Sequence, residues 1–412
     1  MIKNLDYSFD YIFFFVGAFF ALSANLFLGY NNLEDLGLFN KSFAIFIIFG
    51  QLFLFSIHDN LVKNLILEKN RVKYLSSIFF VLFCSIIFCI LFFIVIDFFD
   101  VGKNLFVGIN FFIFSISIPF FIFNKVLFAI LNADKKFHLY FFLNNLRPIL
   151  IFVILIILYL NKINITIVFF ICEIIILFIN LFFYKKFNIL IKINMIDFFL
   201  VKKIVIFNFL SLPHSLLSYS FLRIDVIVLS FFVDLKTLGF YSFSAMIIEG
   251  IYQLLTMMRD RVNPELSKSL TIKTYKISSY LKKILLNVLM FVSIFIIVYY
   301  IFFPLFSYFS NKDLLLSRNI FCIISIGLFI FSLSSVMEHI FLMNNKPLYQ
   351  STYIIFGNLL NITLNIVLIN IFGVYGAAAA TCISYALLSL IILYYSLIVS
   401  KKNSKSRKKF NP

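Results

Sequence analysis

Residues 75–96 read LSSIFFVLFCSIIFCILFFIVI, a run without a single charged side chain. A helix crosses the hydrocarbon core of a bilayer with about 20 apolar residues, so this run predicts a transmembrane helix. The rest of the chain has the same character, because 63% of its residues are hydrophobic, 13% are charged and the mean hydropathy is +1.05. A water-soluble fold cannot bury that proportion of apolar surface. We therefore expect an integral membrane protein.

Further apolar runs of similar length lie on both sides of this one. Together they predict an all-α polytopic membrane protein with about twelve transmembrane helices. The predicted spans are 9–29, 38–57, 75–96, 106–131, 140–160, 165–184, 204–233, 238–258, 284–307, 320–343, 349–372 and 375–397.

The formal net charge of +17 would suggest a nucleic-acid partner in a soluble protein. Here lysine and arginine gather in alternate short loops, above all in residues 259–283 and 400–412, which indicates membrane topology and no nucleic acid. The opposite side holds few basic residues: Lys41, Lys103, Lys162, Lys236, Lys312 and Arg318. Because cytoplasmic loops carry the excess of basic residues, we expect both termini in the cytoplasm.

An internal repeat divides the chain. Residues 33–42, LEDLGLFNKS, align with residues 235–244, LKTLGFYSFS, at an offset of 202 residues. Six spans separate the two copies, which predicts two pseudo-symmetric six-helix bundles of parallel topology around a central cavity. We expect an N-terminal bundle over residues 1–190, a cytoplasmic linker over 191–203, a C-terminal bundle over 204–399 and a basic tail over 400–412.

The first span could also be a cleaved secretory signal, since Lys3 precedes it and the small residues of 21–24 follow its apolar core. We expect it to belong to the fold, because the repeat gives it a counterpart later in the chain. The five cysteines all fall in apolar runs without a CxxC spacing, so we predict no disulfide, no metal site and no cofactor. No pattern typical of an enzyme site is present.

Ionisable side chains inside a bilayer are costly unless they face a cavity or a partner, so each is a candidate for function. In the span 204–233, taken as one helix, the polar residues fall on one arc: Asn208, Ser211, His214, Ser215, Ser218 and Asp225. This arc, on a helix interrupted by Pro213, predicts a face that lines the substrate path. The alternative is a polar face buried against neighbouring helices.

Other candidates lie on other spans. Asn361 and Asn365 form part of a polar stripe in the span 349–372 and are assigned to the path. Arg147 and Arg223 are the deep arginines, and a guanidinium suits a lipid-linked diphosphate. The alternative for either arginine is an ion pair within the membrane, for instance with Glu173 or Asp225. The candidates for coupling to an ion are Asp225, Glu249, Glu338 and Glu173, with structural hydrogen bonding or solvation in a cavity as the alternative.

Several motifs resemble those of a known family. They are residues 36–39 (LGLF), 223–225 (RID) leading into 238–241 (LGFY), 261–267 (RVNPELS), and 361–365 (NITLN) through 372–384 (FGVYGAAAATCIS). On these residues the chain resembles the O-antigen and capsule polysaccharide flippases of the multidrug/oligosaccharidyl-lipid/polysaccharide exporter superfamily. The small residues of 376–380 would let the last two helices approach closely.

The resemblance implies a fold and a function. It implies two six-helix bundles whose central cavity opens alternately to each side of the bacterial cytoplasmic membrane. The implied substrate is an undecaprenyl-diphosphate-linked oligosaccharide, moved from the inner to the outer leaflet in exchange for protons or sodium, with polysaccharide polymerase machinery as a partner. Because only two arginines lie at depth, we expect a neutral or weakly charged glycan.

Three other functions are weighed against this one. A cation-coupled multidrug antiporter of the same superfamily would use Asp225 or Glu249 as its coupling carboxylate. A membrane polymerase or ligase is disfavoured because the chain has no long outer loop. A peptidoglycan-precursor flippase usually has additional helices.

Overall fold

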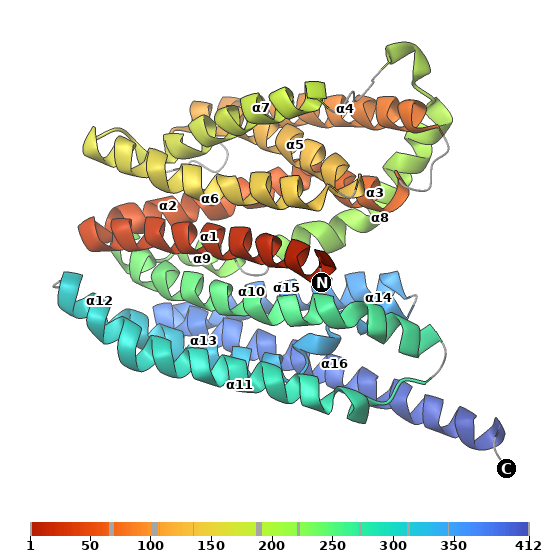
Figure 1. The fold of residues 1–412 in the computed structure, drawn as a ribbon. Helices are drawn as coiled ribbons and strands as arrows, with labels where there is room; N and C mark the ends of the chain where they lie inside the picture. The colour runs from red at the N-terminus through yellow and green to blue at the C-terminus, as the bar shows by residue number, and fades with distance from the viewer. Residues whose placement is uncertain are drawn as a thin grey trace. The chain divides into compact units, whose positions relative to one another are not determined.

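In the computed structural model, the described residues are 2–65, 70–99, 106, 108–134, 136–186, 192–220, 223–271, 274–310, 314–344 and 346–410. The regular structure in these ranges is entirely helical, as Figure 1 shows. The prediction of an all-α protein is confirmed.

The helices pack into two compact units, Met1–Ser220 and Phe221–Pro412. The helices of unit 1 are α1 (Ile2–Asn31), α2 (Leu33–Leu54), α3 (Ile57–Asn64), α4 (Arg71–Phe98), α5 (Phe111–Ala133), α6 (Phe137–Leu160), α7 (Val168–Lys186) and α8 (Phe198–Ser220). Those of unit 2 are α9 (Ile224–Leu229), α10 (Leu235–Thr271), α11 (Leu281–Ile297), α12 (Phe303–Ser310), α13 (Leu315–Ser332), α14 (Ile340–Met343), α15 (Pro347–Phe372) and α16 (Val374–Phe410). Unit 1 extends beyond residue 190, because α8 packs against α2, α3 and α4.

Eleven helical segments of the described residues are long and apolar enough to cross a membrane. The remaining predicted span is the first, 9–29, which corresponds to α1, where Val16–Asn31 forms a shorter apolar segment. Helix α4 exposes a row of large apolar side chains, of which Phe83, Phe88, Leu91 and Ile94 are each more than half exposed. Such a surface suits lipid and would be an aggregation hazard in water. The chain is therefore a multi-pass membrane protein, as predicted.

Three predicted spans are interrupted. The second ends in two left-handed residues, Phe55 and Ser56, with φ of 50° and 55°, before α3 begins. In the seventh, α8 ends at Ser220 and α9 begins at Ile224. In the tenth, a 3₁₀ turn at Ser335–Met337 separates α13 from α14. The prediction that spans 204–233 and 320–343 are continuous helices is wrong, because average hydropathy does not register a change of backbone direction.

Helix α5 is the centre of unit 1, where it contacts α2, α3, α4, α6 and α7. The Asn110 side chain caps it by accepting a hydrogen bond from the Ile113 N–H. Aromatic rings fill the space around it, and the Phe46 ring lies 5.1 Å from that of Phe121 and 5.0 Å from that of Phe169. Unit 1 is thus packed largely through phenylalanine.

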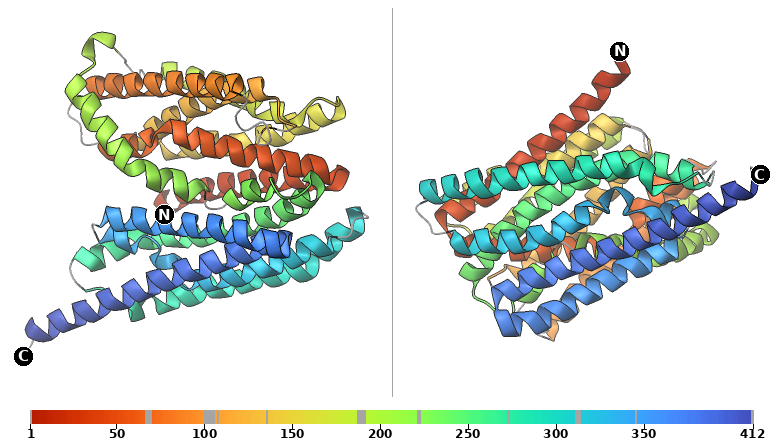
Figure 2. Two further views of the ribbon diagram at one scale, coloured as in Figure 1. Left: turned by 180° about the vertical axis from the view of Figure 1, so that it is seen from behind. Right: turned by 90° about the horizontal axis from the view of Figure 1, so that it is seen from below.

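In unit 2, the helices approach one another most closely at glycine residues. Helix α16 lies along α13 and α15, an arrangement that Figure 2 shows from two sides. A Cβ atom on Gly327 of α13 would lie 2.6 Å from the Cys382 backbone of α16. At the turn from α15 to α16, Gly373 has a φ of 57°, and a Cβ atom on Gly376 would lie 2.0 Å from the Leu368 carbonyl oxygen. The small residues of this turn do allow close approach, as expected from the motif.

The two copies of the repeat occupy equivalent places, each at the start of a helix. Leu33 is the first residue of α2 and Leu235 is the first of α10. The Asn32 side chain caps α2 by accepting from the Glu34 N–H, and the Asp234 side chain accepts from the Thr237 N–H in α10. The hydroxyl of Thr237 also donates to Asp234, and these bonds lower the pKa of that carboxyl.

Candidate functional site

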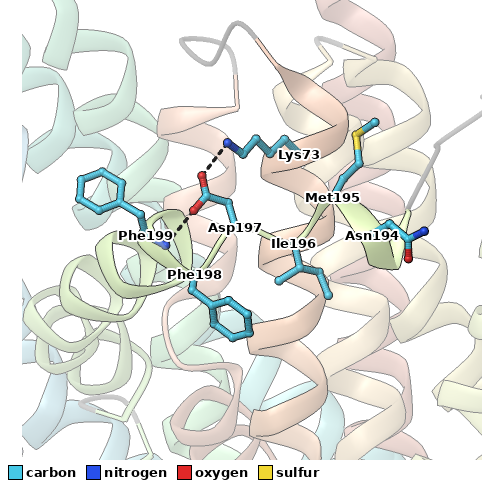
Figure 3. A pocket seen from close by; sticks show the side chains of 7 residues that line it. All are labelled: Lys73, Asn194, Met195, Ile196, Asp197, Phe198 and Phe199. Carbon is cyan, nitrogen blue, oxygen red and sulfur yellow. Dashed lines mark hydrogen bonds and ion pairs between the residues drawn. The ribbon is translucent and has the colours of Figure 1, made fainter.

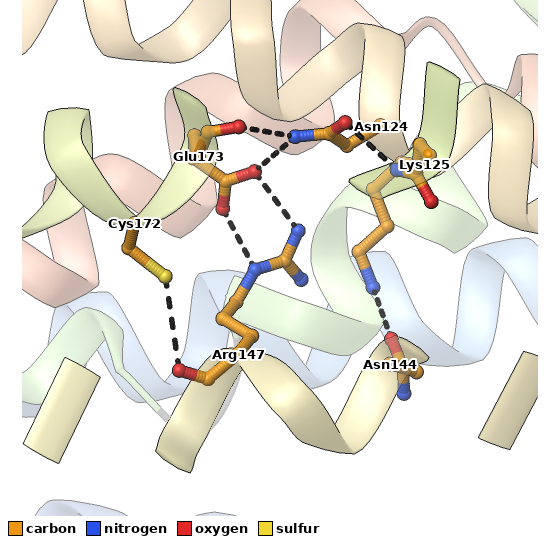
Figure 4. Close-up of polar contacts among 7 residues, drawn as sticks. Asn124, Lys125, Asn144, Arg147, Cys172 and Glu173 are labelled. Carbon is orange, nitrogen blue, oxygen red and sulfur yellow. Dashed lines mark hydrogen bonds and ion pairs between the residues drawn. The ribbon is translucent and has the colours of Figure 1, made fainter. Parts of the chain in front are cut away.

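An ion pair lies in the interior of unit 1, between Arg147 of α6 and Glu173 of α7 (Figure 4). The guanidinium Nε donates to Glu173 Oε1 at 2.7 Å and Nη2 donates to Oε2 at 3.2 Å. Glu173 is 1% exposed and Arg147 is 8% exposed. Arg147 and Glu173, both candidates from the sequence, thus form an ion pair with each other. An ion pair of this kind was the alternative to phosphate binding for Arg147.

Two asparagines extend this pair. Asn124 of α5 donates its Nδ2 to Glu173 Oε2 at 2.8 Å, and Asn180 of α7 donates to Asn124 Oδ1 at 2.9 Å. Lys125, the next residue on α5, contacts Asn144 Oδ1 at 3.5 Å. Lys125 falls near the inner end of the predicted span 106–131, and the structure places it within α5, eight residues before the end of that helix. Lys125 is thus a further basic residue within a predicted span.

The polar face of α8 is partly used for packing. Asn208 is fully buried and its Oδ1 accepts from Asn60 of α3 at 2.6 Å, and Asn60 also bonds the Tyr74 hydroxyl. The Ser56 hydroxyl donates to the Ser215 hydroxyl at 2.9 Å. Ser211 bonds the Phe207 carbonyl of its own helix. For Asn208 and Ser215 the structure matches the alternative of a buried helix contact.

The remaining members of the predicted arc lie elsewhere or are not described. The side chains of His214 and Ser218 lie outside the described residues. Asp225 belongs to α9 and not to α8, so its assignment to the same arc is wrong.

In unit 2, Arg223 pairs with Glu249 of α10. The distance from Nη2 to Oε1 is 2.6 Å, and the side chains are 15% and 25% exposed. Arg223 immediately precedes α9, so the end of that short helix holds the guanidinium toward α10. This pair is more accessible than the one between Arg147 and Glu173.

A second pair in unit 2 joins Arg259 of α10 to Glu338. Arg259 Nη1 lies 2.6 Å from Glu338 Oε2, and the Tyr252 hydroxyl donates to Oε1 at 3.3 Å. Glu338 follows the 3₁₀ turn between α13 and α14, so the interruption of that span presents the carboxylate to α10.

Asp225 is the candidate carboxylate without a cation. It is 3% exposed, and among the described residues no basic group lies within 4 Å of it. Its Oδ2 accepts hydrogen bonds from the Tyr241 hydroxyl at 2.5 Å and from the Thr381 hydroxyl at 3.2 Å. Helices α9, α10 and α16 each contribute one member of this group. Asp225 Oδ1 also accepts from the Val226 N–H at 2.8 Å. Among the described residues, the carboxyl is therefore held by hydroxyls and a backbone N–H and not by arginine or lysine.

Asn361 and Asn365 are both fully buried on α15. Asn365 Nδ2 donates to Asn361 Oδ1 at 2.8 Å, while Asn361 Nδ2 and Asn365 Oδ1 have no partner among the described residues. Buried amide atoms of this kind usually have a partner, so these two atoms have unused capacity to bind one.

Outside the spans, an open hollow of about 630 Å³ lies at the start of α8, as Figure 3 shows. It is lined by Lys73, Asn194, Met195, Ile196, Asp197, Phe198 and Phe199. Lys73 Nζ lies 2.6 Å from Asp197 Oδ2, and this bond, with one from the Phe199 N–H, lowers the pKa of the carboxyl. The hydroxyls of Ser76 and Ser77 accept from the Lys192 and Asp197 N–H groups. These bonds fix where α8 begins.

Sequence reasoning missed the polar partners of the candidates, namely Asn60, Asn124, Lys125, Tyr241, Arg259 and Thr381. One signal was available for two of them. Asn124 and Lys125 are adjacent polar residues within a predicted span, which is unusual in a lipid-embedded helix. Tyr241 and Thr381 gave no warning, since tyrosine and threonine are common in transmembrane helices. Asn60 and Arg259 lie just outside the predicted spans 38–57 and 238–258.

Comparison with known sequences gives a partial match. No family model matches the chain. The uncharacterized membrane protein MJ1375 of Methanocaldococcus jannaschii is 29% identical over 203 residues, which span 46% of this chain and 46% of that protein. The match thus covers less than half of the relative's length.

Comparison with solved structures shows the fold. The lipid II flippase MurJ in an inward closed conformation matches with a TM-score of 0.75 and 20% identity, over 96% of this chain and 90% of that one. An inward-facing multidrug resistance MATE family transporter of the MOP superfamily matches with a TM-score of 0.73 and 13% identity, over 94% and 96%. The chain has the helical fold that these two proteins share.

Proposed function

We propose that this protein is an ion-coupled flippase, which moves an undecaprenyl-diphosphate-linked oligosaccharide from the inner to the outer leaflet. The observation that carries ion coupling is Asp225. Of the four candidate carboxylates, Glu173, Glu249 and Glu338 are each paired with an arginine. Among the described residues, Asp225 is bound instead by the Tyr241 and Thr381 hydroxyls and by the Val226 N–H. A buried carboxylate with oxygen neighbours can bind a proton or a sodium ion without first leaving an arginine.

The fold and the motifs support a lipid-linked substrate. One structural neighbour is a lipid II flippase, and the motifs of residues 223–225, 261–267 and 372–384 resemble those of polysaccharide flippases. The protein would act in the bacterial cytoplasmic membrane with both termini in the cytoplasm. It would deliver its glycan to polymerase machinery for O-antigen, capsule or a related polymer.

A cation-coupled multidrug antiporter is the second candidate. A MATE family transporter matches the chain almost as well as the flippase does, with TM-scores of 0.73 and 0.75. The shared fold therefore does not distinguish a flippase from an antiporter. A transport experiment is needed to distinguish them.

Deletion of the gene in its own host tests the substrate. The expected result is loss of surface glycan with undecaprenyl-linked intermediates retained on the inner leaflet, restored by the gene on a plasmid. Unchanged glycan together with altered efflux of cationic dyes would instead identify an antiporter.

Asp225→Asn tests the coupling site. The amide keeps the shape and can still accept from Tyr241, so we expect normal protein levels with a loss of export of about tenfold or more. Asp97→Asn, which removes an exposed carboxylate at the end of α4, is the matched control and should export normally. Full export by the Asp225 variant would remove this residue from the coupling mechanism.

A further inference from the structure

Among the described residues, the polar cluster inside unit 1 has more basic side chains than acidic ones. Arg147 and Lys125 are its two cations, and Glu173 is the one carboxylate recorded with them (Figure 4). Both cations lie against the same aromatic ring, because Arg147 Cζ is 4.9 Å and Lys125 Nζ is 5.8 Å from the centre of Phe121. A basic side chain at membrane depth that has no carboxylate beside it is costly to charge, and an anion bound next to it would lower that cost.

Arg147 is poorly placed to supply binding energy to an anion. Two of its nitrogens bind Glu173, and the same carboxylate accepts from Asn124. A phosphate that bound Nε and Nη2 of Arg147 would have to displace Glu173, and this would leave a buried carboxylate without its cation. Removing one partner of a buried pair costs about 3–5 kcal/mol. The remaining nitrogen, Nη1, has no hydrogen-bond partner among the described residues, so Arg147 can still contribute one donor.

Lys125 is placed differently. Its only recorded hydrogen bond is the long one of 3.5 Å to Asn144 Oδ1, and among the described residues no carboxylate lies within 4 Å of its Nζ. An ammonium has three donors, so most of its capacity is unused. The side chain is partly exposed. It lies about 12 Å along α5 from the end of the helix at Ala133, at 1.5 Å per residue.

We infer that Lys125, with the amide of Asn144 and the outer nitrogen of Arg147, binds the diphosphate of a lipid-linked substrate. This inference rests on the proposed function and names the residue that recognises the substrate's charged group. Lysine binds phosphate well as a point charge. The pair of Arg147 and Glu173 holds the site in shape, and Lys125 supplies the charge that the ligand neutralises.

A binding measurement on the whole protein in lipid nanodiscs tests the site. The probes are undecaprenyl diphosphate, undecaprenol as the uncharged lipid, inorganic diphosphate as the free anion and phosphatidylglycerol as an ordinary anionic lipid. The variants are Lys125→Met, Lys125→Arg and, as a matched control, Lys41→Met, which removes a buried lysine elsewhere in unit 1. Thermal unfolding of each variant shows that it is folded.

The expected result is binding of undecaprenyl diphosphate by the wild type, weakened about tenfold or more in Lys125→Met, since one charged contact with phosphate is lost. Lys125→Arg should retain most of the affinity and Lys41→Met should behave as the wild type. Undecaprenol should bind the wild type and Lys125→Met alike.

Three outcomes would overturn the inference. Equal binding by the wild type and a folded Lys125→Met would exclude Lys125 and leave the proposed function intact. Equal losses in Lys125→Met and Lys41→Met would mean a general charge effect and no site. No binding of undecaprenyl diphosphate by the wild type, or equal binding of phosphatidylglycerol, would reject the proposed substrate and the site together.

Discussion

The two units treat their buried charges in different ways. In unit 1, two hydrogen bonds join Arg147 to Glu173. The Glu173 side chain is 1% exposed and also accepts a hydrogen bond from Asn124. Unit 2 holds each of its pairs by one recorded hydrogen bond between partly exposed side chains, and leaves Asp225 without a cation among the described residues. The difference indicates that the pair of unit 1 is mainly structural, whereas the proposed transport would use the more exposed charges of unit 2.

The largest expected effect comes from removing the charge of Glu173, the most deeply buried member of these ion pairs. Glu173→Gln leaves Arg147 buried without a counter-charge and should lower the free energy of unfolding by about 3–5 kcal/mol. The matched change in unit 2, Glu249→Gln, should cost no more than about 1 kcal/mol, because that pair is partly exposed. Chemical unfolding in detergent measures both. Similar losses from the two variants would show that the pairs are equivalent.

A second, smaller effect concerns packing. Gly327→Ala should destabilise unit 2 by about 1–3 kcal/mol, because the new Cβ would meet the Cys382 backbone, which cannot rotate away. Gly250→Ala is the control, since nothing lies within 4 Å of its Cβ position in α10. Alanine there should be neutral or stabilise the helix by up to about 1 kcal/mol. A neutral Gly327→Ala would mean that α13 and α16 are less tightly packed than the structure shows.

The smallest effect compares two carboxylates outside the spans. Asp197 in unit 1 and Asp234 in unit 2 both have lowered pKa values, one through Lys73 and the other through Thr237. Their contribution to stability is therefore present above the unfolded pKa of about 3.9 and is lost as the pH falls through the folded value. Asp197→Asn should reduce the acid sensitivity of unfolding and its dependence on salt. Asp234→Asn should reduce acid sensitivity with little change in salt dependence, because its partner is uncharged.

Salt is the decisive variable in that comparison. Measurements of the unfolding midpoint at pH 7 and pH 4, each at low and high sodium chloride, separate the two residues. An equal response to salt in both variants would show that the ion pair between Lys73 and Asp197 contributes nothing to stability.

Most of the fold could be predicted from the sequence, because length and apolar composition determine which segments can cross a bilayer. The interruptions could not. Phe55 and Ser56 adopt left-handed conformations although neither is glycine, so no residue type announces the break. The break before α9 removed Asp225 from the helical face on which periodicity had placed it.

The candidate site was predictable as a set of residues and not as a set of contacts. Rarity of charge in a bilayer singled out Arg147, Glu173, Arg223, Asp225, Glu249 and Glu338. Their partners depend on how helices rotate against one another, which the sequence does not encode locally. Arg223 and Glu249 lie on neighbouring elements 26 residues apart, yet only the packing of α9 on α10 brings them within 2.6 Å.

The turn between α15 and α16 has a mechanical consequence. Gly373 turns the chain with a φ of 57°, and Gly376 then brings the start of α16 against the Leu368 carbonyl with no room for a Cβ atom. This contact opposes sliding of one helix along the other at this end. We therefore expect α15 and α16 to move together as one rigid body. Asn361 and Asn365 on α15 and Thr381 on α16 are carried together, and any displacement of α16 that pulls Thr381 from Asp225 shifts the two asparagines as well.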